Sequence, residues 1–329
     1  MHPLLVTGAA GFVGARFVES CNQVQIPIIS VDHPDYFKSR FENASLDFGR
    51  IIDRETLPDT LKTKPPLLSG IIHLGACTDT TELDVAYLTK MNLDYSKSLW
   101  IYASQHQIPF FYASSAATYG EGEQGYEDDE NKFGLLKPLN PYGESKLQFD
   151  IWALEQEKKG IHPPAWSGFK FFNVYGFGER HKGSMASVIL HAFDQIQKTG
   201  QAKLFRSHRA GISDGEQKRD FVSVADVVEV LHFARTKPLV RGIYNLGTGR
   251  ARTFLDLVRA VFKSLDLPEN IQFIDTPVHL RERYQYFTQA EMGRLRAQGY
   301  TKTFASLEDG VRNYVERLKK AGQPPGDLK

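Results

Sequence analysis

The sequence predicts an α/β protein built on a doubly wound parallel sheet, with a smaller interleaved α/β domain. Three observations carry this prediction. Short apolar runs alternate with longer segments of helical periodicity through the first half of the chain, as in sheets whose strands are buried on both faces. A glycine-rich turn follows the first apolar run. After residue 176 the order becomes irregular, which indicates a second and smaller unit.

Six apolar runs are predicted as strands, over residues 3–7, 26–32, 70–76, 109–115, 169–176 and 243–249. Segments 87–106, 143–159 and 254–265 carry apolar residues at helical spacing, whereas 208–220 is predicted as a polar loop. Such sheets bind ligands at the carboxyl ends of their strands. We therefore expect residues 1–173 and 220–248 to form the sheet domain, and residues 174–219 and 249–329 to form a smaller domain over that edge.

Composition excludes several classes of protein. The 329 residues hold 40 Lys and Arg against 39 Asp and Glu, and this balance argues against a nucleic-acid or membrane-surface partner. The two cysteines, Cys21 and Cys77, have no metal-ligand spacing and form no disulfide framework, which favours a reducing compartment. Without a targeting segment or a membrane-spanning run, we expect a cytoplasmic protein with no metal.

The stretch "TGAAGFVG" (7–14) predicts a dinucleotide site. Gly8, Gly11 and Gly14 stand at a spacing that lets the backbone turn sharply and approach a pyrophosphate at a helix N-terminus. A plain strand–helix turn would explain an isolated glycine motif equally well. At the first strand–helix junction of an alternating pattern, the motif instead predicts a Rossmann-type sheet.

The residues after the second predicted strand bear on the choice of cofactor. Asp32 suits the adenosine ribose hydroxyls and favours NAD, whereas Lys38, Arg40 and Arg54 can hold a 2′-phosphate. These cations are also compatible with a solvated loop, and His33 beside Asp32 weakens any discrimination. We predict NADP, with NAD as the alternative. Further residues predicted to line the cofactor are Phe12, Val13, Leu74, Gly75, Ala76, Cys77, Thr78 and Asn92.

A catalytic group is predicted around "NPYGESK", which contains Tyr142 and Lys146 one helical turn apart. The lysine ammonium can lower the pKa of the phenol and bond the nicotinamide ribose, which makes the tyrosine a plausible base. Ser115 ends the fourth predicted strand, where its hydroxyl can bond the reacting oxygen of a substrate. Tyrosine and lysine at this spacing are usually structural, but here they follow a dinucleotide turn and a strand-end serine in order.

With these motifs the chain resembles the extended short-chain dehydrogenase/reductases, which transfer hydride to and from nucleotide sugars with NAD(P). More specific motifs resemble the ADP-glycero-manno-heptose 6-epimerases over more than 250 residues: "GACTDTTE", "YASSAATYG", "FFNVYG", "HKGSMASV", "KRDFV", "NLGTGRA" and "RYQYFTQA". The resemblance implies an isomerase that inverts C6″ of ADP-D-glycero-β-D-manno-heptose for lipopolysaccharide core synthesis. It also implies a homo-oligomer, often a pentamer.

In that family, inversion proceeds by oxidation at C6″, which we expect to give an aldehyde, and by return of the hydride to the other face. The resemblance carries a second base onto Lys182, opposite Tyr142; the alternative is that Lys182 pairs with a phosphate. It also places Val174 and Lys182 at the cofactor. Substrate contacts are implied for Ser115, Asn173, Ser184, His191, Phe205, Ser207, Arg219 and Tyr284, with Arg219 as the diphosphate clamp.

Two alternatives remain. Another nucleotide-sugar enzyme of the same fold is one, but a 4,6-dehydratase needs an acidic pair where Ala116 and Ala117 stand, and a 4-epimerase needs no second base. The other is a non-catalytic NAD(P)-binding sensor, which would not need Tyr142 or Lys146. The loop 206–218 is longer than the family pattern, which leaves the exact place of Ser207 open.

Overall fold

Seven parallel strands form the central sheet in the computed structural model, which describes residues 2–237, 239–281 and 284–322. Their order across the sheet is β10-β6-β5-β4-β1-β2-β3. The chain therefore winds outward from β1 in both directions, and the reversal lies between β1 and β4. The strands are β1 (Leu4–Thr7), β2 (Ile28–Asp32), β3 (Arg50–Asp53), β4 (Gly70–His73), β5 (Phe110–Ser115), β6 (Trp166–Phe171) and β10 (Gly242–Leu246).

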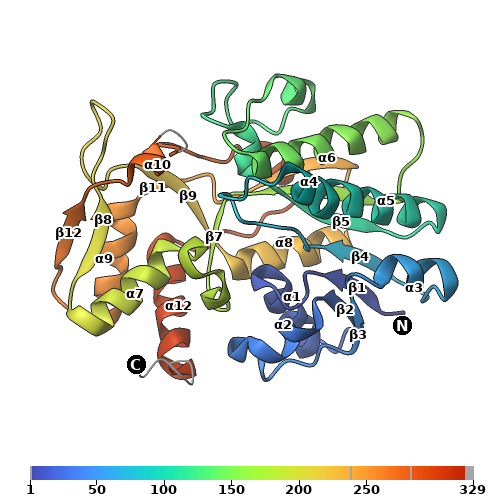
Figure 1. Ribbon diagram of the computed structural model, residues 1–329, viewed down its shortest axis with the longest axis horizontal. Coiled ribbons are helices and arrows are strands. Elements are labelled where there is room, and N and C mark those ends of the chain that lie inside the picture. Colours follow the sequence, from blue (N-terminus) through green and yellow to red (C-terminus); the bar gives the residue numbers. More distant parts are fainter. Residues whose placement is uncertain (1, 238, 282–283, 323–329) are drawn as a thin grey trace.

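Helices cover both faces of this sheet, as Figure 1 shows. On one face α1 (Phe12–Gln23) packs against α8 (Val224–Thr236), and on the other lie α5 (Tyr95–Gln105) and α6 (Pro141–Lys158). The short helices α2 (Pro34–Ser39) and α3 (Leu57–Thr63) connect the strands at one edge. Fully buried aromatic side chains, among them Trp100, Phe110 and Trp166, fill the space between sheet and helices. The doubly wound α/β fold predicted from the sequence is confirmed.

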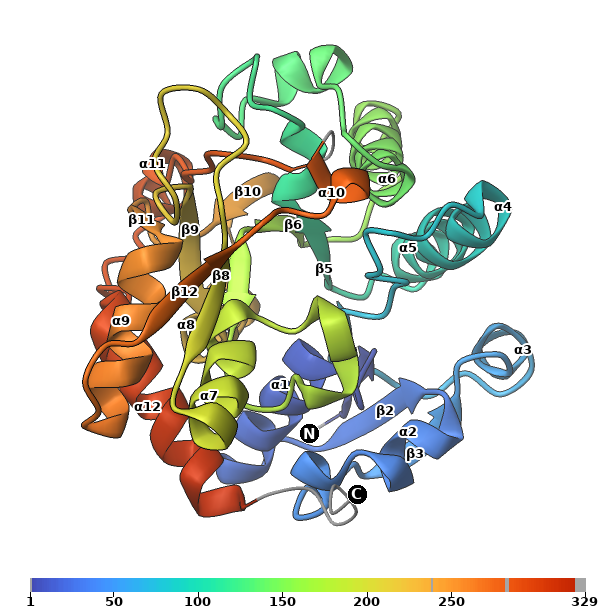
Figure 2. The ribbon, with the colours of Figure 1, turned by 60° about the vertical axis from the view of Figure 1, so that its left-hand side comes forward.

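A second unit has its own apolar core beside the central sheet (Figure 2). It contains a three-stranded sheet, a two-stranded parallel sheet and three longer helices. Its elements are β7 (Asn173–Tyr175), β9 (Lys218–Ser223) and β11 (Ala251–Thr253); β8 (Ala202–Phe205) and β12 (Ile271–Ile274); and α7 (Val188–Thr199), α9 (Phe254–Leu265) and α12 (Leu307–Ala321). Ile189, Val261 and Val311 are fully buried in this core.

The end of the chain returns to the first core. Ala290, Leu295, Tyr300 and Phe304 belong to the same apolar cluster as the central strands, and α11 (Gly293–Ala297) contacts β10. The segment between them and β12 carries α10 (Val278–Arg281). The domain boundaries expected from the sequence stay a prediction. The packing shows two apolar cores, and apolar residues of the segment 290–304 belong to the first of them.

Several elements differ from the predicted ones. The strand expected over 169–176 is two strands, because the chain leaves the central sheet at Phe172 and continues as β7 in another sheet. The helix expected over 87–106 is α4 (Val85–Leu88), a π-helical turn η2 (Thr89–Asp94) and α5. The loop expected over 208–220 ends at Gln217, and β9 begins at the next residue, Lys218.

Strand β9 was not predicted from hydropathy because its first three residues are charged. Arg219 and Asp220 are nevertheless buried, and Asp220 accepts hydrogen bonds from the backbone amides of Thr248, Gly249 and Ala290. Buried charges with polar partners look like loop residues in a sequence. None of the helices in the described part of the chain combines the length and apolar character needed to cross a bilayer.

Candidate active site

The glycine turn after β1 forms a cradle that side chains would fill. Gly8 has a φ of +65°, and a Cβ on it would lie 2.7 Å from the amide nitrogen of Gly75 at the end of β4. A Cβ on Gly14 would lie 2.0 Å from the carbonyl oxygen of Gly8. Gly11 caps α1 without a side-chain hydrogen bond, and Phe12 and Val13 begin the helix. The first amides of α1 therefore remain available to an anion, which fits the pyrophosphate of a dinucleotide.

At the adenosine end, Asp32 is buried and already engaged. Its carboxylate accepts hydrogen bonds from the amides of Ala10 (3.1 Å) and His33 (2.9 Å). Burial raises the pKa of Asp32, while the His33 amide and the Arg40 guanidinium oppose that rise. Arg40 also donates to the Ala10 carbonyl oxygen at 2.6 Å, so it stabilises the glycine turn.

Two guanidinium groups flank the ring of Tyr36 beside Asp32. The Cζ of Arg40 lies 4.1 Å from the ring centroid and that of Arg54 lies 5.9 Å away. Lys38 is exposed on α2. Positive charge thus gathers at the end of β2, where an adenosine ribose meets such sheets.

On the other side of the turn, Asn92 orders the loop after β4. It is fully buried in the π-helical turn, accepts a hydrogen bond from the Cys77 amide (2.8 Å) and donates to the Cys77 carbonyl (3.0 Å). It also donates to the Ser145 hydroxyl on α6. The backbone amides of Leu74 and Gly75 donate hydrogen bonds to the carbonyl oxygen and the hydroxyl of Thr7 on β1. The remaining predicted residues of this loop are Ala76, which is half-buried, and Thr78, which is exposed.

Ser115 and Tyr142 meet at the carboxyl edge of the sheet. Ser115 ends β5 and caps the 3₁₀ turn η3 (Ala116–Tyr119), while Tyr142 lies in the first turn of α6, which Asn140 caps through the Gly143 amide. Burial raises the pKa of Tyr142, and the neighbouring hydroxyl of Ser115 opposes that rise. This arrangement can move a proton at a substrate oxygen placed between the two hydroxyls.

Lys146 lies one turn farther along α6 and is almost wholly buried. Its ammonium donates to the carbonyl oxygen of Ala113 at 3.0 Å. Burial lowers the pKa of Lys146 to about 8, and the carboxylate of Asp150 opposes that change. A lysine this close to neutrality can exchange a proton in the physiological range.

Lys182 lies on the 3₁₀ segment η5 (Arg180–Met185), which follows β7 and reaches the glycine turn. Its Nζ is 3.7 Å from a carboxylate oxygen of Glu179 and 5.3 Å from the ring centroid of Phe12. Glu179 is fully buried and accepts hydrogen bonds from both the amide and the hydroxyl of Ser187. The ammonium of Lys182 therefore faces the start of α1, next to the cofactor cradle.

Residues of the smaller unit line the other side. Ser184 is exposed on η5, and His191 is half-buried on α7. Asn173 begins β7 and is exposed, and Val174 beside it is half-buried. Phe205 ends β8. These residues come from consecutive elements, and among the described residues no hydrogen bond or ion pair joins them directly to Tyr142.

Arg219 and Tyr284 are brought together. The Arg219 Cζ lies 5.6 Å from the Tyr284 ring centroid, and the guanidinium donates to the Lys218 carbonyl oxygen. Arg219 is 6 % exposed, and burial lowers its pKa. Within the described ranges no carboxylate lies at ion-pair distance from it. A buried cation of this kind suits an anionic ligand.

The loop from 206 to 217 holds contacts that the sequence did not indicate. The Ser207 amide donates to Asp214, and the Nδ1 of His208 lies 2.9 Å from the hydroxyl of Tyr286. Tyr286 stood within the predicted motif "RYQYFTQA", but His208 lies in the predicted polar loop and no pattern marked it. Arg283 of that motif lies outside the described residues. Among the described residues, no group of His, Cys, Asp and Glu is arranged to hold a metal ion.

Comparisons with known proteins agree with this geometry. The model of the NAD dependent epimerase/dehydratase family matches residues 4–247. A protein of Fusobacterium nucleatum named ADP-L-glycero-D-manno-heptose-6-epimerase is 44% identical, with 95% of this chain and 97% of the relative covered. A protein of the same name from Nitratidesulfovibrio vulgaris is 42% identical, covering 97% and 99%. The crystal structure of the Helicobacter pylori protein of that name aligns with a TM-score of 0.79 at 25% identity, covering 96% of this chain and 95% of that one.

Proposed function

Because the chain belongs to the NAD-dependent epimerase/dehydratase family, and within it to the ADP-L-glycero-D-manno-heptose 6-epimerases, we propose that it inverts C6″ of ADP-D-glycero-β-D-manno-heptose. The product is the L-glycero epimer, which serves lipopolysaccharide core synthesis. The meeting of the Ser115 and Tyr142 hydroxyls beside the glycine cradle carries this proposal, since the reaction needs a proton acceptor next to a hydride acceptor.

Tyr142 acts as the base for one epimer. It takes the proton of the C6″ hydroxyl while Ser115 holds the same oxygen. A bound nicotinamide supplies reversible acceptance of the C6″ hydride. C6″ of a heptose is bonded to carbon on both sides, so its oxidised form is a ketone and not the aldehyde expected from the sequence. The carbonyl then reorients, and its other face receives the hydride.

Lys182 acts as the second acid–base group, on the opposite side of the carbonyl. The "HKGSMASV" motif supports this role. Its contacts with Glu179 and Phe12 equally suit an ammonium that pairs with a cofactor phosphate when substrate is absent. Lys146 supports Tyr142 and bonds the nicotinamide ribose. Arg219 clamps the diphosphate, with Tyr284 beside it; the other substrate contacts proposed are Asn173, Ser184, His191, Phe205 and Ser207.

We propose NADP as the cofactor, with NAD as the alternative. The Asp32 carboxylate is occupied by two backbone amides, and the guanidinium groups of Arg40 and Arg54 stand beside it. Cations at this place attract a 2′-phosphate. Chromatography of the nucleotide released on denaturation identifies the cofactor. The variant Arg54→Leu is expected to weaken the binding of NADP much more than the binding of NAD. An equal loss of affinity for both cofactors would contradict the proposal.

We further propose a cytoplasmic homo-oligomer, in keeping with the family. Light scattering coupled to gel filtration measures the number of subunits, and a purely monomeric active enzyme would contradict the oligomer.

One experiment tests the proposed reaction. The purified enzyme with its bound cofactor is incubated with ADP-D-glycero-β-D-manno-heptose, and proton NMR follows both C6″ epimers to equilibrium. UDP-galactose serves as the parallel substrate, because a 4-epimerase of the same fold would convert it. Conversion of the heptose alone is expected. Conversion of UDP-galactose alone would assign a 4-epimerase, and no conversion by folded, loaded enzyme would reject the proposal.

A further inference from the structure

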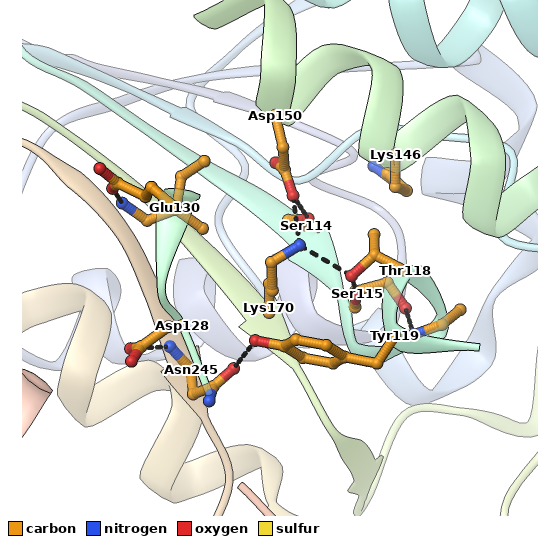
Figure 3. A network of polar contacts seen from close by, with 12 residues as sticks. Ser114, Ser115, Thr118, Tyr119, Asp128, Glu130, Lys146, Asp150, Lys170 and Asn245 are labelled. Atoms are coloured by element: carbon orange, nitrogen blue, oxygen red, sulfur yellow. Dashed lines mark hydrogen bonds and ion pairs between the residues drawn. The ribbon is translucent and has the colours of Figure 1, made fainter. Parts of the chain in front are cut away.

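A buried ion pair that the proposed reaction does not use lies close to Ser115 and Lys146 (Figure 3). The Nζ of Lys170 is 2.6 Å from a carboxylate oxygen of Asp150, and both side chains are completely inaccessible to solvent. Lys170 comes from β6 and Asp150 from α6, so the pair joins the sheet to the helix that carries Tyr142. Two charges removed from water are costly unless further hydrogen bonds satisfy them.

The remaining bonds of Asp150 go to β5. Its carboxylate accepts from the Tyr112 hydroxyl at 2.9 Å and from the Ser114 hydroxyl at 2.7 Å. One turn earlier on the same helix face, Lys146 donates to the carbonyl oxygen of Ala113. Asp150 and Lys146 therefore engage consecutive residues of one strand, and this locks the position of α6 along β5.

The remaining bond of Lys170 leads to Ser115. Its ammonium donates to the Thr118 hydroxyl at 2.7 Å, and that hydroxyl donates to the carbonyl oxygen of Ser115 at 2.8 Å. Ser114 and Lys170 are also register partners in the parallel pairing of β5 with β6. Through Thr118, the ion pair thus fixes the turn that presents the Ser115 hydroxyl.

We propose that Asp150 and Lys170 are positioning residues of the reaction: together they hold Ser115, Tyr142 and Lys146 in mutual register and balance the buried charge beneath the phenol. This inference rests on the proposed function, since it concerns the same hydroxyl pair. The two residues act through others and touch no substrate.

Charge balance distinguishes this role from mere packing. Asp150 raises the pKa of both Tyr142 and Lys146, and Lys170 compensates that carboxylate directly. Burial lowers the pKa of Lys170, and Asp150 opposes that change. The titratable groups that face this set are Cys77 beside Tyr142 and Lys146, His73 beside Lys146, Asp128 beside Lys170, and Tyr112, whose hydroxyl donates to Asp150.

The first variant is Lys170→Met, which keeps a side chain of similar length and removes its positive charge. It leaves the Asp150 carboxylate unbalanced, so deprotonation of Tyr142 becomes harder. The acid limb of the kcat–pH profile is expected to move to higher pH, and kcat at neutral pH to fall by about 10²-fold with KM unchanged, as for a displaced catalytic group. Lys170→Arg keeps the charge and is expected to recover most of the rate.

Because either single variant leaves a buried charge alone, the double variant Asp150→Asn/Lys170→Met is made as well. It carries no unpaired charge and is expected to fold, yet to stay slow because the register is lost. Val230→Ala, in the buried core of α8, is the matched control. It lowers the thermal midpoint but is expected to leave the acid limb unchanged. A double variant with the wild-type rate and pH profile would overturn the proposal.

A readout independent of activity separates this inference from the proposed function. In protein labelled with ¹³C at lysine Cε, the Lys146 signal, assigned through Lys146→Arg, titrates near its pKa of about 8. Asp150→Asn is expected to lower that midpoint, and Lys170→Met to raise it. If neither variant shifts the midpoint of the Lys146 signal, the positioning role is contradicted. If the wild-type enzyme converts no heptose, the proposed reaction is contradicted instead; shifted Lys146 midpoints in the two variants would then still support the positioning role.

Discussion

At the scale of single residues, burial and charge oppose one another throughout the site. Burial raises the pKa of Tyr142, which the Ser115 hydroxyl opposes, and lowers the pKa of Lys146, which the Asp150 carboxylate opposes. The sequence indicated Tyr142, Lys146 and Ser115 by their spacing and order. It did not indicate Asp150 or Lys170, because a carboxylate in mid-helix and a lysine in an apolar strand show no sign of being paired until the chain folds.

Removal of the phenol hydroxyl tests its role as a base. Tyr142→Phe is expected to lower kcat by about 10² to 10⁴-fold, the range for a positioned acid–base group. The fold should persist because the ring remains in place. NMR of the two heptose epimers measures the rate, and far-UV circular dichroism checks the fold. Turnover at the wild-type rate would remove Tyr142 from the mechanism.

Lys182 can serve either as the second base or as a phosphate partner, and one variant separates the two. Lys182→Met is expected to cut kcat as severely as loss of Tyr142 while leaving cofactor affinity unchanged. Lys198→Met, at the exposed end of α7, is the control for loss of a lysine charge. Wild-type kcat combined with a raised cofactor Kd would instead assign Lys182 to the phosphate, next to Phe12.

His73 makes the protein sensitive to acid. It is fully buried on β4 between the Thr7 and Ser96 hydroxyls, and burial lowers its pKa from 6.5 to about 3. Below pH 6.5 the unfolded chain takes up a proton that the folded chain refuses. Its contribution to stability is therefore complete above pH 6.5 and is lost progressively as the pH falls toward 3, at up to about 1.4 kcal/mol per pH unit.

The variant His73→Gln isolates this effect, since an amide takes up no proton. Urea unfolding at pH 7 and pH 5 is expected to show a smaller loss of stability in His73→Gln than in wild type. His106→Gln, an exposed histidine on the same face of the sheet, is the control and should lose as much as wild type. Equal losses in all three proteins would exclude His73 as the source.

At the scale of elements, the glycine turn joins β1, α1 and β4. A Cβ on Gly14 would lie 2.0 Å from the Gly8 carbonyl, so Gly14→Ala forces α1 away from the strand. The purified variant is expected to carry little or no nucleotide, measured by chromatography after denaturation. Gly134→Ala is the matched control, because nothing lies within 4 Å of a Cβ there. Nucleotide content equal to wild type in Gly14→Ala would contradict the cradle.

Elements with uniform apolar runs could be predicted, and those with mixed character could not. The strands β1, β2, β4 and β5 lie within their predicted segments, and β10 begins one residue before its own, because all their residues are buried or nearly so. The edge strand β3, "RIID", has two exposed residues and escaped the same criterion. The break at Phe172 was invisible because hydrophobicity continues through it while the chain changes sheets.

At the scale of the whole molecule, two apolar cores divide the chain. Leu257 is buried in the core of α7, α9 and α12, and Leu257→Ala is expected to cost about 2–5 kcal/mol. Hydrogen exchange measured by mass spectrometry should rise in those three helices and stay low in β1, β4 and β5. Leu5→Ala, in the core of the central sheet, is expected to give the opposite pattern. A uniform rise in both variants would mean one cooperative core.

The return of residues 290–304 to the first core has a consequence for biosynthesis. On the ribosome a domain at the start of a chain ordinarily folds as soon as it has emerged. Here the central sheet awaits Leu295, Tyr300 and Phe304, which are translated about 50 residues after its last strand, β10 (Gly242–Leu246). A nascent chain stalled before them carries an incomplete hydrophobic interior, so the central sheet is expected to complete its folding only after these residues have emerged.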